Sequence, residues 1–520
     1  MQNILLEIDA STIDWSRAQF ALTAIYHWLF VPLTLGLAVI MGIMETKYYR
    51  TRDPFWLQTA KFWQKLFGVN FAMGVATGII LEFEFGTNWS NYSWIVGDIF
   101  GAPLAIEGIV AFFMESTFVA VMFFGWKKVS PGFHLASTWL TGVGATLSAW
   151  WILVANSWMQ YPVGCEFNPD TMRHEMVSFW EVALSPFAVD KFFHTVISSW
   201  IIGAVFVVAV SSWYLLKKRE TKMAVASIKI GAVVGLVAAL GAAVTGHKSG
   251  QTVAQVQPMK LAAMEALYNG GEKQSLTMIA LVNPFKQADY ENEQEPSMKI
   301  AMPYALSLMA TNTLDGYVPG INDILNGYTK ADGTVEPSAD EKIARGKKAI
   351  AALQDYRAAK KAHRDAEAEK QLKVFRENEK YFGYGYIRDK HELVPSVPIN
   401  FYAFRVMVGL GCLFILFFAV VLFYIYKKDI TRPRWLQWAA IAMVPLAYIA
   451  SESGWLVAEF GRQPWTIQDM LPTWAAVSNL NSGSVALTFF IFLALFTTML
   501  AVEISILLKQ IKKGPEYSEN

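Results

Sequence analysis

FYAFRVMVGLGCLFILFFAVVLFYIY, residues 401–426, is an apolar run in which Arg405 is the only charged side chain. About 20 consecutive apolar residues suffice to cross the hydrocarbon core of a bilayer, so this run predicts a transmembrane helix. The whole chain of 520 residues is 54% hydrophobic and 17% charged, whereas roughly a quarter of an average soluble protein is charged. The composition therefore predicts an all-α integral membrane protein.

Runs of this kind recur, and together they predict about nine transmembrane helices. The runs at 67–81 and 228–244 are short and rich in glycine, and the other seven are longer. The nine runs are approximately 20–44, 67–81, 102–126, 135–156, 192–216, 228–244, 401–426, 435–455 and 485–508.

Basic residues gather in alternate connections between these runs, which indicates the orientation in the membrane. One set of connections holds most of the Lys and Arg residues, and the other set offers Arg17, Arg173 and Arg462. Cytoplasmic loops carry the excess of positive charge. We therefore expect the N-terminus outside and the C-terminus in the cytoplasm, which requires an odd number of helices.

A polar segment separates two membrane blocks, so we divide the chain into 1–244, 245–400 and 401–520. Segment 245–400 carries 20 basic and 20 acidic residues, the density of a soluble domain, and the topology places it outside as a large loop between helices six and seven. Its stretch 338–380 is rich in Ala, Lys and Glu and predicts a solvated helix with charge pairs at helical spacing that serves as spacer or cover.

Several classes of protein are excluded by counting. The net charge of +1 leaves no overall field to attract nucleic acid. Cys165 and Cys412 are too few for a disulfide framework or a cysteine-rich metal site, and no Cys-x-x-Cys-His motif is present for covalent haem attachment. Seven histidines, most of them outside the apolar runs, are also too few for a haem–copper oxidase.

Three histidines fall at or within the membrane runs. His27 and His194 lie toward the outer ends of helices one and five, and His134 opens helix four on the cytoplasmic side. For any one of them, a hydrogen-bonded packing residue is an equally weighted interpretation. Two histidines on different helices near one face favour a ligand held between helices.

Carboxyl groups inside a membrane are expensive, so each is a functional candidate. Glu107 and Glu115 are eight residues apart, which advances a helix by about 12 Å and rotates it by about 80°, so both line one side at different depths. The alternative is a pair of structural carboxyls bonded to neighbouring Ser, Thr or Trp. A ladder of protonatable groups suits a proton path, which we favour over the structural interpretation.

The motif GWLVAEFGRQPW at 454–465 follows helix eight and contains Trp455, Glu459 and Arg462. The spacing of Glu459 and Arg462 fits an ordinary helix-end ion pair or a charged site for the acid groups of a cofactor. Met407 lies beside Arg405 in helix seven, where a packing role is the default for methionine. It gains weight because His and Met form a known axial pair of haem, and His194 lies at a similar depth.

Several of these segments resemble subunit I of cytochrome bd ubiquinol oxidase. The resemblance is carried by RAQFALTAIYHWLFVPLTLG at 17–36, GTNWS at 86–90, GDIFGAPLAIEG at 97–108, KFFHTV at 191–196 and EFGRQPW at 459–465. These motifs cover most of the membrane portion and are highly specific. The long loop, reaching Tyr384-Gly-Tyr, resembles the long quinol-loop subgroup of that family.

The resemblance implies a set of cofactors and ligands. His194 and Met407 would be the axial ligands of a low-spin haem b. His27 and Glu459 would each hold one of two high-spin haems, a second haem b and haem d, with Glu107 at the dihaem site as a further candidate iron ligand. Arg405, Trp455 and Arg462 would contact the cofactors. Glu115 would lie on the proton route, which Ser148 and Asn156 would extend.

The resemblance also implies the activity and the partners. KLAAME, at 260–265, matches the part of the loop associated with quinol oxidation, so Lys260 and Glu265 become catalytic candidates; from sequence alone they are two charges on an exposed stretch. The protein would be a quinol:oxygen oxidoreductase that generates a proton-motive force in the bacterial inner membrane. A second multi-span subunit and small single-helix subunits would be its partners.

Two other functions stay open at this point. Glu107, Glu115 and Glu459 also suit a proton-coupled secondary transporter, although we find no two-fold internal repeat. A haem-binding membrane scaffold without oxidase activity is the third interpretation.

Overall fold

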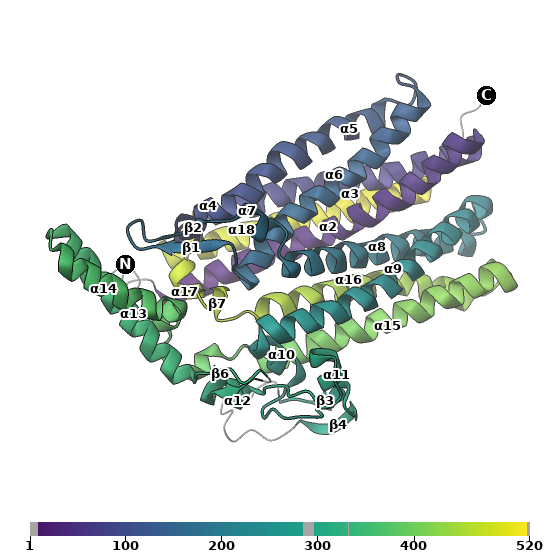
Figure 1. Ribbon diagram of the computed structural model, residues 1–520. Coiled ribbons are helices and arrows are strands. Elements are labelled where there is room, and N and C mark those ends of the chain that lie inside the picture. The colour runs from purple at the N-terminus through teal and green to yellow at the C-terminus, as the bar shows by residue number, and fades with distance from the viewer. Residues whose placement is uncertain (1–8, 284–295, 331, 517–520) are drawn as a thin grey trace.

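The computed structural model describes residues 9–283, 296–330 and 332–516, and its helices run side by side in one bundle (Figure 1). Within these residues, nine helical segments are long and apolar enough to cross a membrane, which confirms the predicted fold class. They are α2 (Ala10–Thr51), α3 (Pro54–Thr87), α4 (Ser90–Ile106) continued by η1 (Glu107–Phe112) and α5 (Phe113–Phe124), α6 (Pro131–Gln160), α8 (Pro186–Leu216), α9 (Thr221–Val256), α15 (Val397–Lys427), α16 (Arg434–Phe460) and α18 (Ser482–Lys513).

The starts of three helices follow a simple sequence signal, a capping residue followed by proline. Asp53, Ser130 and Ser185 each accept a backbone N–H from the first turn of α3, α6 and α8. A proline comes next in each case, where its missing N–H is not needed. Such polar ends extend the helices beyond the apolar runs read from the sequence.

Helix α2 is central and packs against α3, α6, α8 and α18. Gly36 and Gly203 lie where α2 meets α8: a β-carbon on Gly36 would come within 2.7 Å of the Gly203 Cα. Small residues allow such a close approach of two membrane helices. Helices α8, α9, α15 and α16 form a second group in which each packs against two of the others.

The third span is irregular. Between α4 and α5, the residues of η1 form a π-helix that begins at Glu107. A π-helix turns less per residue than an α-helix, because its bonds join residues five apart, and such segments are frequent at functional sites. It changes the relative directions of Glu107 and Glu115 from those of a regular helix.

The extramembrane elements gather at one end of the bundle (Figure 1). They include four antiparallel two-stranded sheets, β1 (Cys165–Asn168) with β2 (Arg173–Met176), β3 (Leu276–Leu281) with β4 (Ser297–Met302), β5 (Tyr328–Thr329) with β6 (Val335–Glu336), and β7 (Trp465–Ile467) with β8 (Leu471–Pro472). The helices there are α7 (Phe179–Ala183), α10 (Pro258–Glu265), α11 (Ala305–Thr311), α12 (Ile321–Asn326), α13 (Ala339–Lys361), α14 (Asp365–Asn378), η3 (Glu379–Tyr386), η4 (Lys390–Leu393) and α17 (Thr473–Ala476). The proposed division of the chain at 244 and 400 stays a prediction, since α9 continues to Val256 and α15 begins at Val397.

The stretch 338–380 differs from the single solvated helix that its charge suggests. It forms two helices, α13 and α14, that pack against each other. Leu353, Tyr356 and Phe375 are buried between them and against Phe167 of β1. Charged residues outnumber the apolar ones in this stretch of sequence, so the apolar face of the two helices was not recognised from the sequence.

Candidate functional site

His27 of α2 is held by Thr77 of α3. The His27 Nδ1 lies 3.0 Å from the Thr77 Oγ1, and that hydroxyl donates its hydrogen to a carbonyl of the preceding turn, Met73 or Gly74. With the hydroxyl hydrogen on that carbonyl, Oγ1 accepts from Nδ1–H and Nε2 is the unprotonated nitrogen, the state that binds a metal ion.

His194 of α8 repeats the same arrangement with Thr245 of α9. Its Nδ1 lies 3.1 Å from the Thr245 Oγ1, which donates to the carbonyl of Gly241 or Ala242. The same bond pattern leaves the Nε2 of His194 as the unprotonated nitrogen. Two histidines on different helices thus have the same threonine contact at Nδ1, which is compatible with metal binding through Nε2.

A glycine lies beside three of the candidate iron ligands, His27, His194 and Met407. A β-carbon on Gly78 would come within 3.0 Å of the His27 Cε1, and one on Gly246 within 3.1 Å of the His194 Cε1. Gly454 of α16 has the same relation to the Met407 Sδ, at 3.1 Å. His194 and Met407 belong to the same four-helix group, and the glycines let the neighbouring helices pack closely against both side chains.

Glu459, at the C-terminal end of α16, accepts hydrogen bonds from three side chains. Its Oε1 accepts from Asn156 Nδ2 at 3.1 Å and Gln160 Nε2 at 3.3 Å, and its Oε2 pairs with Arg462 at 2.5 Å. The helix-end ion pair considered from the sequence is therefore formed. Lys191 donates to Asn156 and lies 5.2 Å from the ring centroid of Trp455.

Positive charge exceeds negative charge around Glu459. Lys191, Lys260 and Arg462 all interact electrostatically with the cluster. Arg462 is 6% exposed, and its Nε and Nη1 have no hydrogen-bond partner among the described residues. Buried guanidinium donors without acceptors favour an anionic group at this place, so the donor set fits the acid groups of haem.

Lys260 is buried, which corrects the expectation of an exposed charge. Its Nζ donates to Gln160 and, at 2.7 Å, to Gln257, and its side chain packs against Gly461. Burial and the nearby charges of Lys191 and Arg462 lower the Lys260 pKa well below its usual value. The amine is therefore buried beside the Glu459 cluster, to which Gln160 connects it, and does not face solvent.

Glu265 is buried as well, at the other end of α10, where it pairs with Arg405 at 2.6 Å. Arg405 also donates to the carbonyls of Met264 and Thr277, so it ties α15 to the extramembrane segment. Burial raises the Glu265 pKa against the opposing effect of Arg405. Lys260 and Glu265 have different partners, and the structure does not bring them together.

A pocket opens beside Glu265. Its lining includes Glu265, Tyr268, Asn269, Thr277 and Lys299, and mixes polar and apolar surface. The Glu265 Oε1 is buried there without a hydrogen-bond partner among the described residues. A ligand hydroxyl would satisfy that oxygen.

The carboxyls of the third span both face α6. Ser148 donates to Glu107 at 2.6 Å, and Glu115 packs against Gly144, where a β-carbon would meet its Cγ at 2.6 Å. Ser148 and Gly144 are about one turn apart on α6. Glu82 of α3 also reaches Glu107 through a hydrogen bond, so this ladder contains a third carboxyl.

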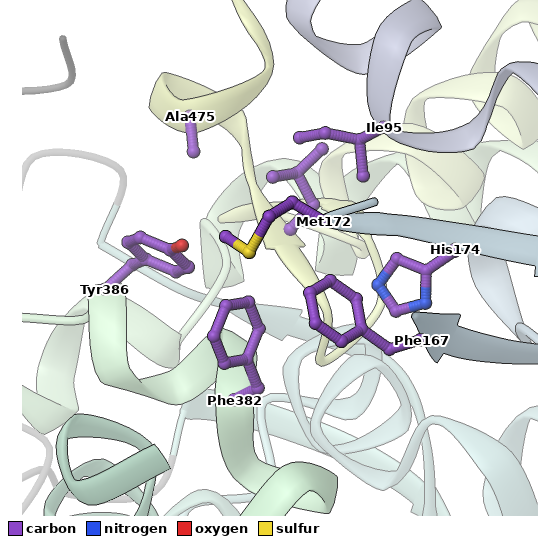
Figure 2. Close-up of a pocket in the computed structure, with 8 residues that line it drawn as sticks. Ile95, Phe167, Met172, His174, Phe382, Tyr386 and Ala475 are labelled. Carbon is purple, nitrogen blue, oxygen red and sulfur yellow. The ribbon is translucent and has the colours of Figure 1, made fainter. Parts of the chain in front are cut away.

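Figure 2 shows a second pocket, on the extramembrane face and lined by none of the predicted site residues. Phe167 and His174 of the β1–β2 hairpin face Phe382 and Tyr386 of η3 across it. Burial lowers the His174 pKa to about 4. The space is apolar and too small for a ring-sized ligand, so it is a packing gap between the hairpin and the long loop.

Sequence reasoning missed Lys191, Thr77 and Thr245. Lys191 had a usable signal, since an ionisable side chain at the outer end of a membrane helix is a functional candidate. The threonines had none, because each lies about 50 residues from the histidine it holds.

Comparison with known proteins decides the family. A family described as cytochrome bd terminal oxidase subunit I matches residues 15–515. The chain belongs to the cytochrome bd subunit I family. It is 42% identical over 527 residues to cytochrome bd-II ubiquinol oxidase subunit 1 of Escherichia coli strain K12, covering 98% of each chain. It is 35% identical to cytochrome bd ubiquinol oxidase subunit 1 of Bacillus subtilis strain 168, over 98% of this chain and 96% of that one.

The fold agrees with a solved cytochrome bd structure. The bd oxidase from Geobacillus thermodenitrificans superimposes with a TM-score of 0.77 at 21% identity, over 97% of this chain and 99% of that chain. Membership of the cytochrome bd family confirms the resemblance read from the sequence. It also confirms an oxidoreductase of the terminal-oxidase class that passes several times through the inner membrane. The transporter interpretation finds no support in these comparisons.

Proposed function

We propose that this chain is the haem-bearing subunit of a quinol oxidase that takes electrons from quinol near the outer face and reduces oxygen to water with cytoplasmic protons. His194 and Met407 hold a low-spin haem b in this proposal. His27 and Glu459 each hold one of two high-spin haems, a haem b and haem d. The complex includes a second multi-span subunit and small single-helix subunits.

The observation that carries the proposal is the matching threonine contact of the two histidines. Thr77 and Thr245 lie 3.0 and 3.1 Å from the Nδ1 atoms of His27 and His194, and in this proposal each hydroxyl accepts from Nδ1–H so that Nε2 binds iron. Haem bound at these positions would supply one-electron transfer and an open coordination position for oxygen. The glycines beside His27, His194 and Met407 let neighbouring helices pack closely against these side chains and so hold them in position.

Quinol oxidation is assigned to the surroundings of Glu265. Its unpartnered Oε1 accepts a hydrogen bond from a quinol hydroxyl and then its proton, while Arg405 holds the carboxylate in place. Lys260 supports the outer cluster through Gln160 and Gln257. The proton of quinol leaves on the outer side.

The proton supply is assigned to the ladder on the third span. Glu115, against Gly144, lies on the cytoplasmic side of Glu107, and Ser148 orients Glu107. Protons that enter from the cytoplasm while quinol protons leave outside separate charge across the membrane. Glu107→Ala should therefore impair oxygen reduction more than quinol binding.

A reduced-minus-oxidised absorption spectrum of the purified complex, with and without carbon monoxide, tests the proposal. We expect a low-spin b band and a red-shifted band that responds to carbon monoxide. His194→Ala and Met407→Ala should each remove the low-spin band while the protein still inserts. Two kinds of b haem without the red-shifted band would replace haem d by haem b, and a colourless complex from haem-sufficient cells would refute the haem assignments.

A further inference from the structure

A buried polar cluster joins α2 to α6 at the end of the bundle opposite the quinol loop. The His134 Nδ1 lies 2.7 Å from the Glu45 Oε1, and the Thr138 hydroxyl donates to the Glu45 Oε2 at 2.5 Å. Glu45, His134 and Thr138 are all buried, with exposed fractions of 2%, 2% and 0%. The positive-inside rule assigns this end, with Lys47 and Arg50 nearby, to the cytoplasm.

The hydrogen bonds fix how many protons the pair holds. The His134 Nε2 lies 3.0 Å from the carbonyl oxygen of Met122, which only accepts. A carboxylate also only accepts, so His134 either donates from both nitrogens as an imidazolium or receives a proton from a neutral Glu45 acid. In both cases the Nδ1–Oε1 bond contains a transferable proton and the pair has no net charge.

Nothing in the function proposed above uses this pair, although polar positions lead from it toward Glu115. Thr138 and Thr141 lie on α6 between His134 and Gly144, and both are fully buried. The rise from Thr138 to Gly144, where Glu115 packs, is about 9 Å. About two water molecules at ordinary hydrogen-bond distances span such a length.

We infer that Glu45 and His134 are the intake of the proton route that continues to Glu115 and Glu107. The inference rests on the proposed oxidase function and names the cytoplasmic start of its proton supply. The proton of the Nδ1–Oε1 bond moves onto Oε1 and makes Glu45 a neutral acid. The acid group then turns its O–H toward the Thr138 oxygen, while the Thr138 hydroxyl turns its own hydrogen from Oε2 toward Thr141. Thr138 takes up the acid proton and passes its own on, which leaves Glu45 as a carboxylate beside a neutral His134. A proton from cytoplasmic water restores the pair, so one proton enters for each that leaves.

The surroundings contain the usual competing explanation, a structural clamp. Trp126 stacks on His134 with ring centroids 3.7 Å apart, and Lys61 lies 5.2 Å from the Trp126 centroid. Gln64 binds both the Trp126 indole and the Met122 carbonyl. Substitution of Glu45 or His134 would lower the stability of the protein whether the pair is a structural clamp or a proton relay. The test must therefore measure proton movement itself.

The chain offers a matched control at the outer end of α3. Glu84 is also 2% exposed, and it accepts the Thr23 hydroxyl at 2.5 Å, as Glu45 accepts that of Thr138. We compare Glu45→Gln and Thr138→Val with Glu84→Gln and Thr23→Val in the intact oxidase complex. Haem spectra and melting temperatures report folding, quinol-driven haem reduction without oxygen reports electron input, and a pH dye reports proton uptake when the reduced complex meets oxygen.

We expect Glu45→Gln and Thr138→Val to slow proton uptake by about a hundredfold, the lower end of what positioned proton transfer contributes. Haem reduction by quinol should stay within about twofold of the wild type, and both control variants should behave as the wild type. Thr138→Val removes no charge, so it carries the test if Glu45→Gln fails to assemble.

Two results would overturn the inference. Uptake within about twofold of the wild type in Thr138→Val, or equal losses in all four variants, would leave the pair as a clamp. Wild-type complex that takes up no protons on meeting oxygen would instead refute the oxidase function itself, and the intake with it.

Discussion

Gly454 of α16 lies directly against Met407 of α15: a β-carbon at position 454 would come within 3.1 Å of the methionine sulfur. Contacts that close are rare, so the methionine or its helix would have to move. The relationship connects a residue of no chemical reactivity to a proposed iron ligand.

Gly454→Ala should therefore disturb the low-spin haem. Alanine is otherwise favoured over glycine in a helix by about 1 kcal/mol, so the complex should still assemble. We expect a weaker or shifted low-spin band in the reduced spectrum. Gly409→Ala, two residues from Met407 on the same helix but with open space beside it, is the control, and equal spectra for the two variants would contradict the assignment of Met407.

The two threonines should act on different haems. Thr245→Val removes the acceptor of the His194 Nδ1–H, and losing such a partner lowers metal-site affinity by about 10–100-fold. The low-spin band should weaken, whereas Thr77→Val should affect the band that responds to carbon monoxide. Thr117→Val is the control, since within the described part of the chain the Thr117 hydroxyl bonds the carbonyl of Phe113 in the preceding turn and no other group. Loss of one and the same band in both variants would refute the separate roles of His27 and His194.

Glu265 and Arg405 should show strong energetic coupling. Removing one partner leaves a buried charge, which costs about 3–5 kcal/mol, so Glu265→Ala and Arg405→Met should each lower the melting temperature of the complex. The double variant should lose clearly less than the sum of the two. Additive losses would show that the ion pair does not fasten the extramembrane segment around α10 to α15.

Lys260 should make stability depend on pH. Its pKa is lowered by burial, so between the folded-state and unfolded-state values the unfolded chain binds one more proton, and stability rises with pH across that window. Lys260→Met should be more stable than the wild type at neutral pH, by an amount that narrows by about 1.4 kcal/mol per pH unit toward pH 10. A difference that stays constant from pH 7 to 10 would contradict the lowered pKa.

Membrane helices are predictable from the sequence because the bilayer imposes a single strong condition, a long apolar run. The runs that begin at residues 20, 192 and 401 each lie inside one observed helix. The ends were less accurate because polar residues continue the helices beyond the hydrocarbon. The mistaken solvated helix in 338–380 has a related cause: a narrow apolar face, with Leu353 and Phe375, is hidden among charges.

The side chains with candidate chemistry were found because buried ionisable groups are rare in a membrane. Their partners were not predictable, since His194 meets Thr245 and Glu45 meets His134 only through the packing of separate helices. The burial of Lys260 and Glu265 was also not predictable from the sequence. Their polar neighbours in the sequence suggest exposure, while the fold covers both.

The π-helix at Glu107–Phe112 has a consequence for the register of the third span. A π-helix amounts to an α-helix with one residue inserted, and one residue is about 100° of rotation. If a residue of this segment were deleted, α5 would turn by that angle and Glu115 would leave Gly144. The proton ladder would then be broken although every titratable side chain would still be present. The rotational position of α5 is therefore as much a part of the site as the carboxyl groups.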